Sequence, residues 1–144
     1  MICQAFDAMN LKHAQYFKSM KVHVTADLKG VVSVDHRSEI AGMVILDSWT
    51  ENSVQAHIKV TNKMCMRTGG LLNEVARYVY DVAGVGLMLG FLRSDNPKAI
   101  EFDKKLGFIV EHTIKDGYAV GVDCVILSMT RDQCNYYPHQ QRAA

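Results

Sequence analysis

Residues 93–108 form the stretch that most constrains how this chain can fold, because strand and helix signals follow one another there without a gap. Asn96 is a good N-cap residue, and Pro97 suits the first helical position, where a missing backbone N–H costs nothing. Gly107 fits the left-handed residue that ends a helix, and Phe108 restarts an apolar, strand-like run. The stretch therefore predicts the end of one strand, a short helix, and the start of the next strand.

Three strand-like runs precede this stretch, and short polar turns separate them. β-Branched and apolar residues dominate the runs, which are Val31–Asp35, Glu39–Asp47 and Ser53–Thr61. The runs predict an antiparallel meander. A loop over 62–69 and a helix from Gly70 to about Ala83 follow it, since apolar residues recur there at steps of three and four.

The remaining elements complete a mixed sheet. Leu87–Leu92 is nearly continuously apolar, which is typical of a central strand covered on both faces. The closing hairpin is predicted over Phe108–Ile114 and Val122–Thr130, around the turn Lys115–Gly121. In the less readable residues 1–30 we expect a short strand over 2–6, a helix capped by Asn10, and an irregular connection over 22–25. From Asn135 onward we expect a frayed tail.

Together these elements predict one α/β domain over residues 1–144, with a mixed sheet and helices on its faces. The sixteen basic residues are balanced by fifteen acidic ones, so the overall charge favours neither a nucleic-acid nor a membrane partner. The four cysteines are scattered without a metal-binding or disulfide pattern, and no apolar run is long enough to span a membrane. We therefore expect a cytoplasmic protein without a metal site.

The pattern Asn-x-x-Ala-x-x-Phe-Asp-x-x-Leu-Gly-Phe, from Asn96 to Phe108, resembles the C-terminal motif of GNAT N-acetyltransferases. The resemblance extends over about residues 31–131, and the compact chain is similar to the small GNAT proteins of bacteriophages and bacteria. It implies the GNAT fold and transfer of an acetyl group from acetyl-CoA to a primary amine by direct attack. The alternative is a catalytically silent GNAT-like domain that binds acyl-CoA or another protein.

The segment from Lys63 to Gly70 is the candidate coenzyme loop. A glycine-containing turn that enters a helix presents free backbone N–H groups to phosphate, and the basic side chains add fixed positive charge. The resemblance implies that this loop cradles the coenzyme pyrophosphate through Lys63, Arg67, Thr68, Gly69 and Gly70. The glycine spacing is compressed relative to the family pattern, and an ordinary helix entrance is the alternative interpretation.

His57 is the candidate general base. Period-two geometry places it on the polar face of its strand, with Ser53, Gln55 and Lys59. An ordinary histidine pKa of about 6.5 suits proton acceptance near neutral pH, and an amine must lose its proton before it attacks a thioester. Glu51 is the substitute candidate, and a merely hydrogen-bonded histidine is the alternative.

The resemblance implies further roles for residues near this strand and in the 93–108 stretch. Asp103 stands where many GNAT enzymes have a tyrosine that protonates the leaving thiolate, and an aspartate can do so only if burial raises its pKa. The backbone of Ile58, Lys59 and Val60 would pair with the pantetheine arm, where the sheet opens beside Leu89–Leu92. Asn96 would also reach that arm, although helix capping alone explains it.

The acceptor side is the least constrained by sequence. Trp49, Glu51 and Tyr118 lie in or beside turns and are the expected substrate-binding residues. The acceptor is an amine on a small molecule or a protein, and the sheet edges allow a homodimer.

Overall fold

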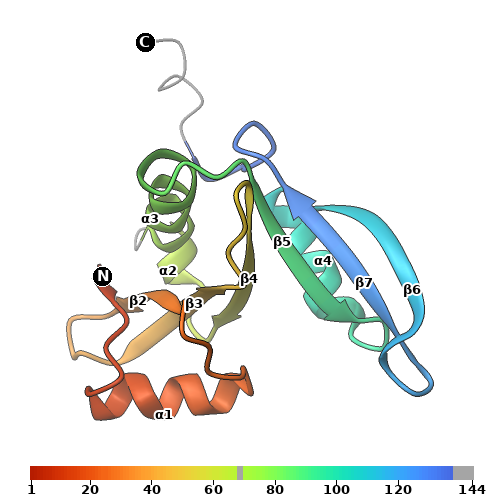
Figure 1. Ribbon diagram of the computed structural model, residues 1–144. Helices are drawn as coiled ribbons and strands as arrows, with labels where there is room; N and C mark the ends of the chain where they lie inside the picture. The colour runs from red at the N-terminus through yellow and green to blue at the C-terminus, as the bar shows by residue number, and fades with distance from the viewer. Residues whose placement is uncertain (68–69, 138–144) are drawn as a thin grey trace.

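The computed structural model describes residues 1–67 and 70–137 and contains a seven-stranded sheet in the order β1-β2-β3-β4-β5-β7-β6 (Figure 1). All neighbouring strands are antiparallel except β4 and β5, which run parallel. The strands are β1 (Ile2–Ala5), β2 (Lys29–Val34), β3 (Ile40–Asp47), β4 (Ser53–Val60), β5 (Leu87–Arg93), β6 (Ile109–Ala119) and β7 (Val122–Met129). The helices are α1 (Leu11–Met20), α2 (Met64–Arg67), α3 (Leu71–Ala76), η1 (Arg77–Val82) and α4 (Pro97–Leu106).

The sheet has a different helix on each face, as the alternation of side chains along β3 shows. Val44 and Leu46 belong to the larger core cluster, together with residues of α3 and α4. Met43 and Ile45 point the other way and pack against Tyr16, Phe17 and Met20 of α1. The sheet therefore has an α1 face and an α3/α4 face, which are separate environments. Successive residues of a strand point alternately to one face and the other.

The two halves of the sheet are joined only briefly. β4 and β5 pair over three residue positions, from Ser53 opposite Leu87 to Gln55 opposite Leu89. Beyond them β5 continues along β7, and β4 continues along β3, so the strands diverge (Figure 1). The expected opening of the sheet between β4 and β5 is confirmed, and it leaves a notch in the middle of the molecule.

Local signals explain where the helices begin. The side chain of Asn10 accepts a hydrogen bond from the backbone N–H of His13, and that of Asn96 accepts one from Ala99. Both N-caps were predicted from sequence and are confirmed. The predicted continuous helix from Gly70 to Ala83 is instead α3 followed by the wider π-helical turns of η1, which end before Gly84, a residue with a φ of 76°.

Two predicted irregular segments are more ordered than expected. The predicted loop over 62–69 contains the one-turn helix α2, whose Cys65 and Met66 are buried in the core. The predicted turn Lys115–Gly121 is wrong over most of its length, because β6 continues to Ala119. Between Ile114 and Ala119 the register with β7 shifts, so that β6 carries extra residues in a bulge.

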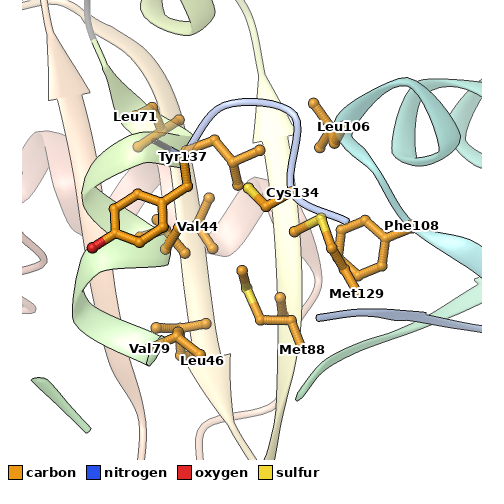
Figure 2. Packing of buried hydrophobic residues seen from close by; sticks show 14 of the residues in the cluster. Val44, Leu46, Leu71, Val79, Met88, Leu106, Phe108, Met129, Cys134 and Tyr137 are labelled. Atoms are coloured by element: carbon orange, nitrogen blue, oxygen red, sulfur yellow. The ribbon is translucent and has the colours of Figure 1, made fainter. Parts of the chain in front are cut away.

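The expectation of a frayed tail from Asn135 is wrong for residues 135–137. The backbone N–H of Asn135 donates to the carbonyl of Leu106, and Tyr137 is only 4% exposed. Figure 2 shows Tyr137 and Cys134 lying against the larger core cluster. The prediction was wrong because the segment is polar in composition except for Tyr137, whose large ring packs into the core. Residues 138–144 lie outside the described part of the chain.

Candidate active site

A cavity of about 310 Å³ occupies the notch between β4 and β5. Its walls are side chains from the end of α1 and the loop after it, β4, β5, α4 and β6. They are Ser19, Met20, Val22, Ala56, His57, Ile58, Lys59, Phe91, Leu92, Ala99, Phe102, Asp103 and Tyr118. The cavity thus brings together three residues expected at a catalytic or substrate site, which are His57, Asp103 and Tyr118.

The cavity reaches both faces of the sheet, because consecutive residues of β4, which point to opposite faces, line it. Ala56 and Ile58 belong with the cluster on the α3/α4 face. His57 and Lys59 therefore point to the α1 face. A group bound in the notch would have His57 on one side and the residues of α4 on the other.

His57 is held by a buried carboxylate. Its Nε2 lies 2.9 Å from Oδ1 of Asp47, which is 4% exposed. Asp47 sits on β3 opposite Gln55, so it is a diagonal cross-strand neighbour of His57 on the same face. Because a carboxylate accepts hydrogen bonds, Nε2 carries the proton in the neutral ring and Nδ1 keeps the lone pair.

Asp47 is the residue of the candidate site that the sequence predictions missed. It closes an apolar run, where it reads as the start of a turn. The available signal was its place in the meander, since Asp47 and His57 lie on neighbouring strands and their pairing follows from the turn between them.

Asp103 lies across the notch from His57, on the buried side of α4. It is 7% exposed, and burial raises the pKa of its carboxyl group to about 7. No N–H or O–H of residues 1–67 and 70–137 donates a hydrogen bond to this carboxyl group, so nothing nearby offsets its loss of hydration. The carboxyl lies over Gly90 of β5, where a β-carbon would be 3.5 Å from Oδ2. Asp103 is thus partly protonated at neutral pH and can donate a proton.

Beyond Gln55, β4 pairs with no further residue of β5, so this edge of β4 faces the notch. The carbonyl of Asn52 accepts from Leu87 of β5, whereas the N–H of Thr61 donates to Ala41 on the β3 side. Backbone direction alternates along a strand, so the N–H and C=O groups of Ile58 and Val60 point into the notch. The backbone of Lys59 points toward β3, and its carbonyl accepts from the hydroxyl of Tyr16.

The candidate coenzyme loop lies at the open end of β4. Lys63, just before the short helix α2, and Arg67, its last residue, are both exposed, and Gly70 adopts a left-handed φ of 63° before α3. A β-carbon at Gly70 would meet no atom of residues 1–67 and 72–137 within 4 Å. Thr68 and Gly69 lie outside the described residues. The loop thus presents two exposed cations after the end of β4, and neither is among the residues that line the notch.

Tyr118 reaches the cavity because of the bulge in β6. Its ring lies 5.3 Å from the guanidinium carbon of Arg93, which is paired with Asp95. The bulge shifts the register by several residues just before Tyr118 and bends the strand. The sequence predicted Tyr118 at the acceptor site from a position beside a turn, whereas the structure places it within β6, and the strand irregularity directs it into the cavity.

Seven predicted site residues of the described ranges are not among those that line the cavity, and they are Val60, Lys63, Arg67, Gly70, Asn96, Trp49 and Glu51. Asn96 caps α4 with its side chain. Trp49 donates its ring N–H to the carbonyl of Asp27 and packs edge-on against Tyr78, with ring centroids 6.0 Å apart. Glu51 lies in the same turn, which Asn52 fastens to Gly86 at the closed end of the β4–β5 pair. The structure therefore places Trp49 and Glu51 at the opposite end of β4 from the notch.

A larger cavity of about 430 Å³ lies between β1, β2 and α3, but it offers little chemistry. Its one carboxylate, Glu74, forms two hydrogen bonds to Arg77 of the same helix. The notch is smaller but holds both an oriented imidazole and a carboxyl group with a raised pKa, and such groups favour it as the reactive site.

Neither a metal cluster nor a membrane-spanning helix is found in the described residues. Residues 1–67 and 70–137 contain no group of three or more His, Cys, Asp or Glu side chains placed to hold a metal ion. Within the same ranges, no helix is both long and apolar enough to cross a membrane.

Comparison with known proteins gives a clear result for structure and none for sequence. No protein-family model matches the chain, and no curated protein sequence does. Among solved structures, a spermidine N-acetyltransferase SpeG chimera from Vibrio cholerae and hSSAT matches with a TM-score of 0.68 at 14% identity, over 90% of this chain and 96% of that one. Spermidine/spermine N-acetyltransferase SpeG from Vibrio cholerae, in complex with manganese ions, matches with a TM-score of 0.67 at 15% identity, over 99% and 96% of the chains.

A third solved structure carries ligands. Spermidine N-acetyltransferase from Vibrio cholerae in complex with CoA and spermine matches with a TM-score of 0.62 at 17% identity, over 89% of this chain and 80% of that one. These matches cover most of both chains, while their low identity speaks only to the fold. The mixed seven-stranded sheet, opened between β4 and β5 and flanked by α1 on one face and α3 and α4 on the other, is the GNAT N-acetyltransferase fold.

Proposed function

We propose that this chain is an N-acetyltransferase that moves an acetyl group from acetyl-CoA directly to a primary amine. The observation that carries the proposal is the arrangement of the notch, where the His57–Asp47 pair lies on one face of the sheet and Asp103 on the other. A base and an acid on opposite sides of one cavity suit a reaction in which one partner loses a proton and the other gains one.

The notch has the features needed to hold acetyl-CoA as a co-substrate. The unpaired backbone of Ile58 and Val60 would hydrogen-bond the amides of the pantetheine arm, as an added strand does. Lys63, Arg67 and the backbone at Gly70 would bind the pyrophosphate, because they are exposed cations and a left-handed glycine in the segment that follows β4. The predicted roles of Asn96, Thr68 and Gly69 in coenzyme binding stay predictions.

The chemistry follows from where the two ionisable groups sit. Nδ1 of His57 takes a proton from the acceptor ammonium, directly or through water, and Asp47 stabilises the imidazolium that results. The freed amine nitrogen forms a bond to the thioester carbonyl carbon, and the positively charged nitrogen of the tetrahedral intermediate then gives its second proton to solvent. The carbon–sulfur bond breaks as the carbonyl re-forms. Asp103 gives its proton to the leaving sulfur, which its pKa of about 7 allows.

We infer a small-molecule amine as acceptor, because the reactive groups lie inside a cavity of about 310 Å³ and are not spread over an open surface. A spermine-bound structure among those of similar fold supports this class of acceptor. The scattered spacing of the four cysteines, which suggests no disulfide framework, fits a reducing, cytoplasmic setting, and the compact chain fits the bacteriophage and bacterial type of GNAT protein. A homodimer stays a further prediction.

The test combines binding with turnover. One-site linkage predicts about 2.7 kcal/mol of stabilisation when acetyl-CoA is present at a hundredfold excess over its dissociation constant. We expect the melting temperature to rise with acetyl-CoA and with CoA, and not with ATP. Release of free CoA in the presence of a panel of primary amines should follow. The proposal fails if acetyl-CoA leaves the melting temperature unchanged.

A catalytically silent GNAT-like acyl-CoA-binding domain is the second candidate. Two observations favour it, which are the compressed coenzyme loop and Asp103 in place of the family's tyrosine. Normal stabilisation by acetyl-CoA, with no CoA release for any amine, would establish this function and reject the first.

A further inference from the structure

The α1 side of the notch carries an ammonium group with no carboxylate beside it. Nζ of Lys59 lies 2.7 Å from Oγ of Ser19 and 5.0 Å from the ring centroid of Tyr16. An ammonium has three N–H donors, and the Ser19 hydroxyl accepts one of them. Within residues 1–67 and 70–137, no Asp or Glu forms an ion pair with Lys59.

Two of the three carboxylates around the notch already have a partner. Asp47 is buried against His57, and Asp95 is paired with Arg93 through two hydrogen bonds. Asp103 lies on the α3/α4 face, across the sheet from Lys59. An amine that enters beside His57 on the α1 face therefore meets the Lys59 ammonium, while Asp47 is already paired with His57 and Asp103 lies on the opposite face.

We propose that Lys59, held by Ser19, is an anion-binding residue of the acceptor site and that the acceptor is a small primary amine carrying a carboxylate. This inference rests on the acetyltransferase activity proposed above and adds the substrate class. Lys59 follows His57 by two residues on the same face, so their α-carbons are about 6.7 Å apart along the strand. A carboxylate at Lys59 would place an amine a few ångströms away, within reach of Nδ1 of His57.

The same charges disfavour a polyamine as acceptor. The second ammonium of a polyamine needs a carboxylate or a carbonyl to replace its hydration, and Lys59 would repel it. Ser19 strengthens the argument, because its hydrogen bond fixes the ammonium at the wall of the cavity. An amino acid satisfies both ends of the site, with the amine at His57 and the carboxylate at Lys59.

The experiment measures kcat/KM for the full chain with acetyl-CoA and three sets of amines, which are amino acids, the matching amino acid amides, and spermidine. We expect the preferred amino acid to exceed both its amide and spermidine by at least about tenfold, as the loss of one charge-assisted contact predicts. Lys59→Gln should lower kcat/KM for the amino acid by about tenfold or more, mainly through a higher KM for the amine. It should leave the value for the amide within about twofold and the stabilisation by acetyl-CoA unchanged.

The control is Lys104→Gln. It removes an exposed lysine of α4 that pairs with Glu101, and neither residue lines the cavity. Wild-type preference for spermidine, or an equal effect of Lys59→Gln on amino acid and amide, would overturn the inference and leave the acetyltransferase function in place. Acetyl-CoA binding without acetylation of any amine would reject both. A Lys59→Gln chain that fails to fold would show a lowered melting temperature, and Lys59→Arg, which keeps the charge, should then retain the preference for the carboxylate.

Discussion

His57 and Asp47 form a carboxylate–imidazole pair across two neighbouring strands, with 2.9 Å between Nε2 and Oδ1. Asp47 is buried and His57 lines the notch, so the pair connects the core to the cavity. A carboxylate in this position fixes the ring orientation and stabilises the charged form of the imidazole during proton transfer.

The first prediction concerns this pair. His57→Gln should lower kcat by about 10²- to 10⁴-fold, because general-base catalysis is lost. Asp47→Asn should lower kcat by about 10²-fold or more, because the imidazole loses its orienting carboxylate. Since the two residues act as a unit, the double variant should be no slower than His57→Gln. Single-turnover kinetics on the four proteins would measure the coupling, and additive losses would contradict it.

The second prediction concerns Asp103 and pH. Its pKa is raised to about 7 in the folded chain, so the unfolded chain releases this proton at lower pH than the folded one. The stability penalty therefore grows as pH rises from about 4 to about 7 and is complete above that. Asp103→Asn should remove a penalty of as much as about 4 kcal/mol at pH 8 and little at pH 4.

Urea unfolding at both pH values checks this, with Glu101→Gln on the exposed face of α4 as the control. The same Asp103→Asn chain should turn over about tenfold more slowly, since a thiolate is a tolerable leaving group even without an acid. An unchanged pH dependence of stability would show that Asp103 does not carry a raised pKa.

The third prediction tests the coenzyme loop. Arg67→Gln should raise KM for acetyl-CoA by about tenfold with little change in kcat, because a contact to phosphate acts equally in the ground and transition states. Arg37→Gln, in the exposed turn between β2 and β3, is the matched control and should change neither constant. Initial rates at varied acetyl-CoA decide the matter, and a loss confined to kcat would move Arg67 out of the coenzyme site.

The fourth prediction compares two glycines with left-handed backbone. A β-carbon at Gly107 would lie 2.0 Å from the carbonyl oxygen of Gln133, whereas one at Gly70 would touch nothing. Gly107→Ala should therefore destabilise the chain by about 3 kcal/mol or more, because the new methyl group clashes with the Gln133 carbonyl and alanine disfavours a positive φ. Gly70→Ala should cost only the conformational term of about 1–2 kcal/mol. Equal losses in chemical denaturation would contradict the close approach of residues 133–135 to α4.

The fifth prediction concerns the C-terminal segment. Tyr137 is buried, and its hydroxyl hydrogen-bonds Asp81, which also pairs with Arg131. Tyr137→Ala should reduce the free energy of unfolding by about 3–5 kcal/mol, as for other large buried rings. Tyr136→Ala is the control, since this side chain is 40% exposed and should cost less than about 1 kcal/mol. Thermal or urea unfolding of both variants would reveal a loose tail if the two losses were alike.

Much of the fold was readable because its signals are local. Asn10 and Asn96 cap the helices that they were expected to cap, and period-two alternation assigned His57 to a face that proved to be the α1 face. The fold agrees with the expected GNAT architecture, and the notch between β4 and β5 opens beside Leu89–Leu92, as expected. The tail and the β6 bulge were misread, because a buried Tyr137 and a shifted register depend on residues far away in the sequence.

The sequence by itself determined which residues cap α1 and α4 and how side chains alternate along β4, and with this alternation the face on which His57 lies. Tertiary structure alone decided that Asp47 holds His57, that Asp103 loses its water, that Tyr118 reaches the cavity, and that Trp49 and Glu51 stay at the closed end of β4. The physical reason is the separation along the chain over which the two kinds of interaction act. Caps and periodicity act within a few residues, whereas burial, strand register and the parting of β4 from β5 arise from packing between segments distant in the chain.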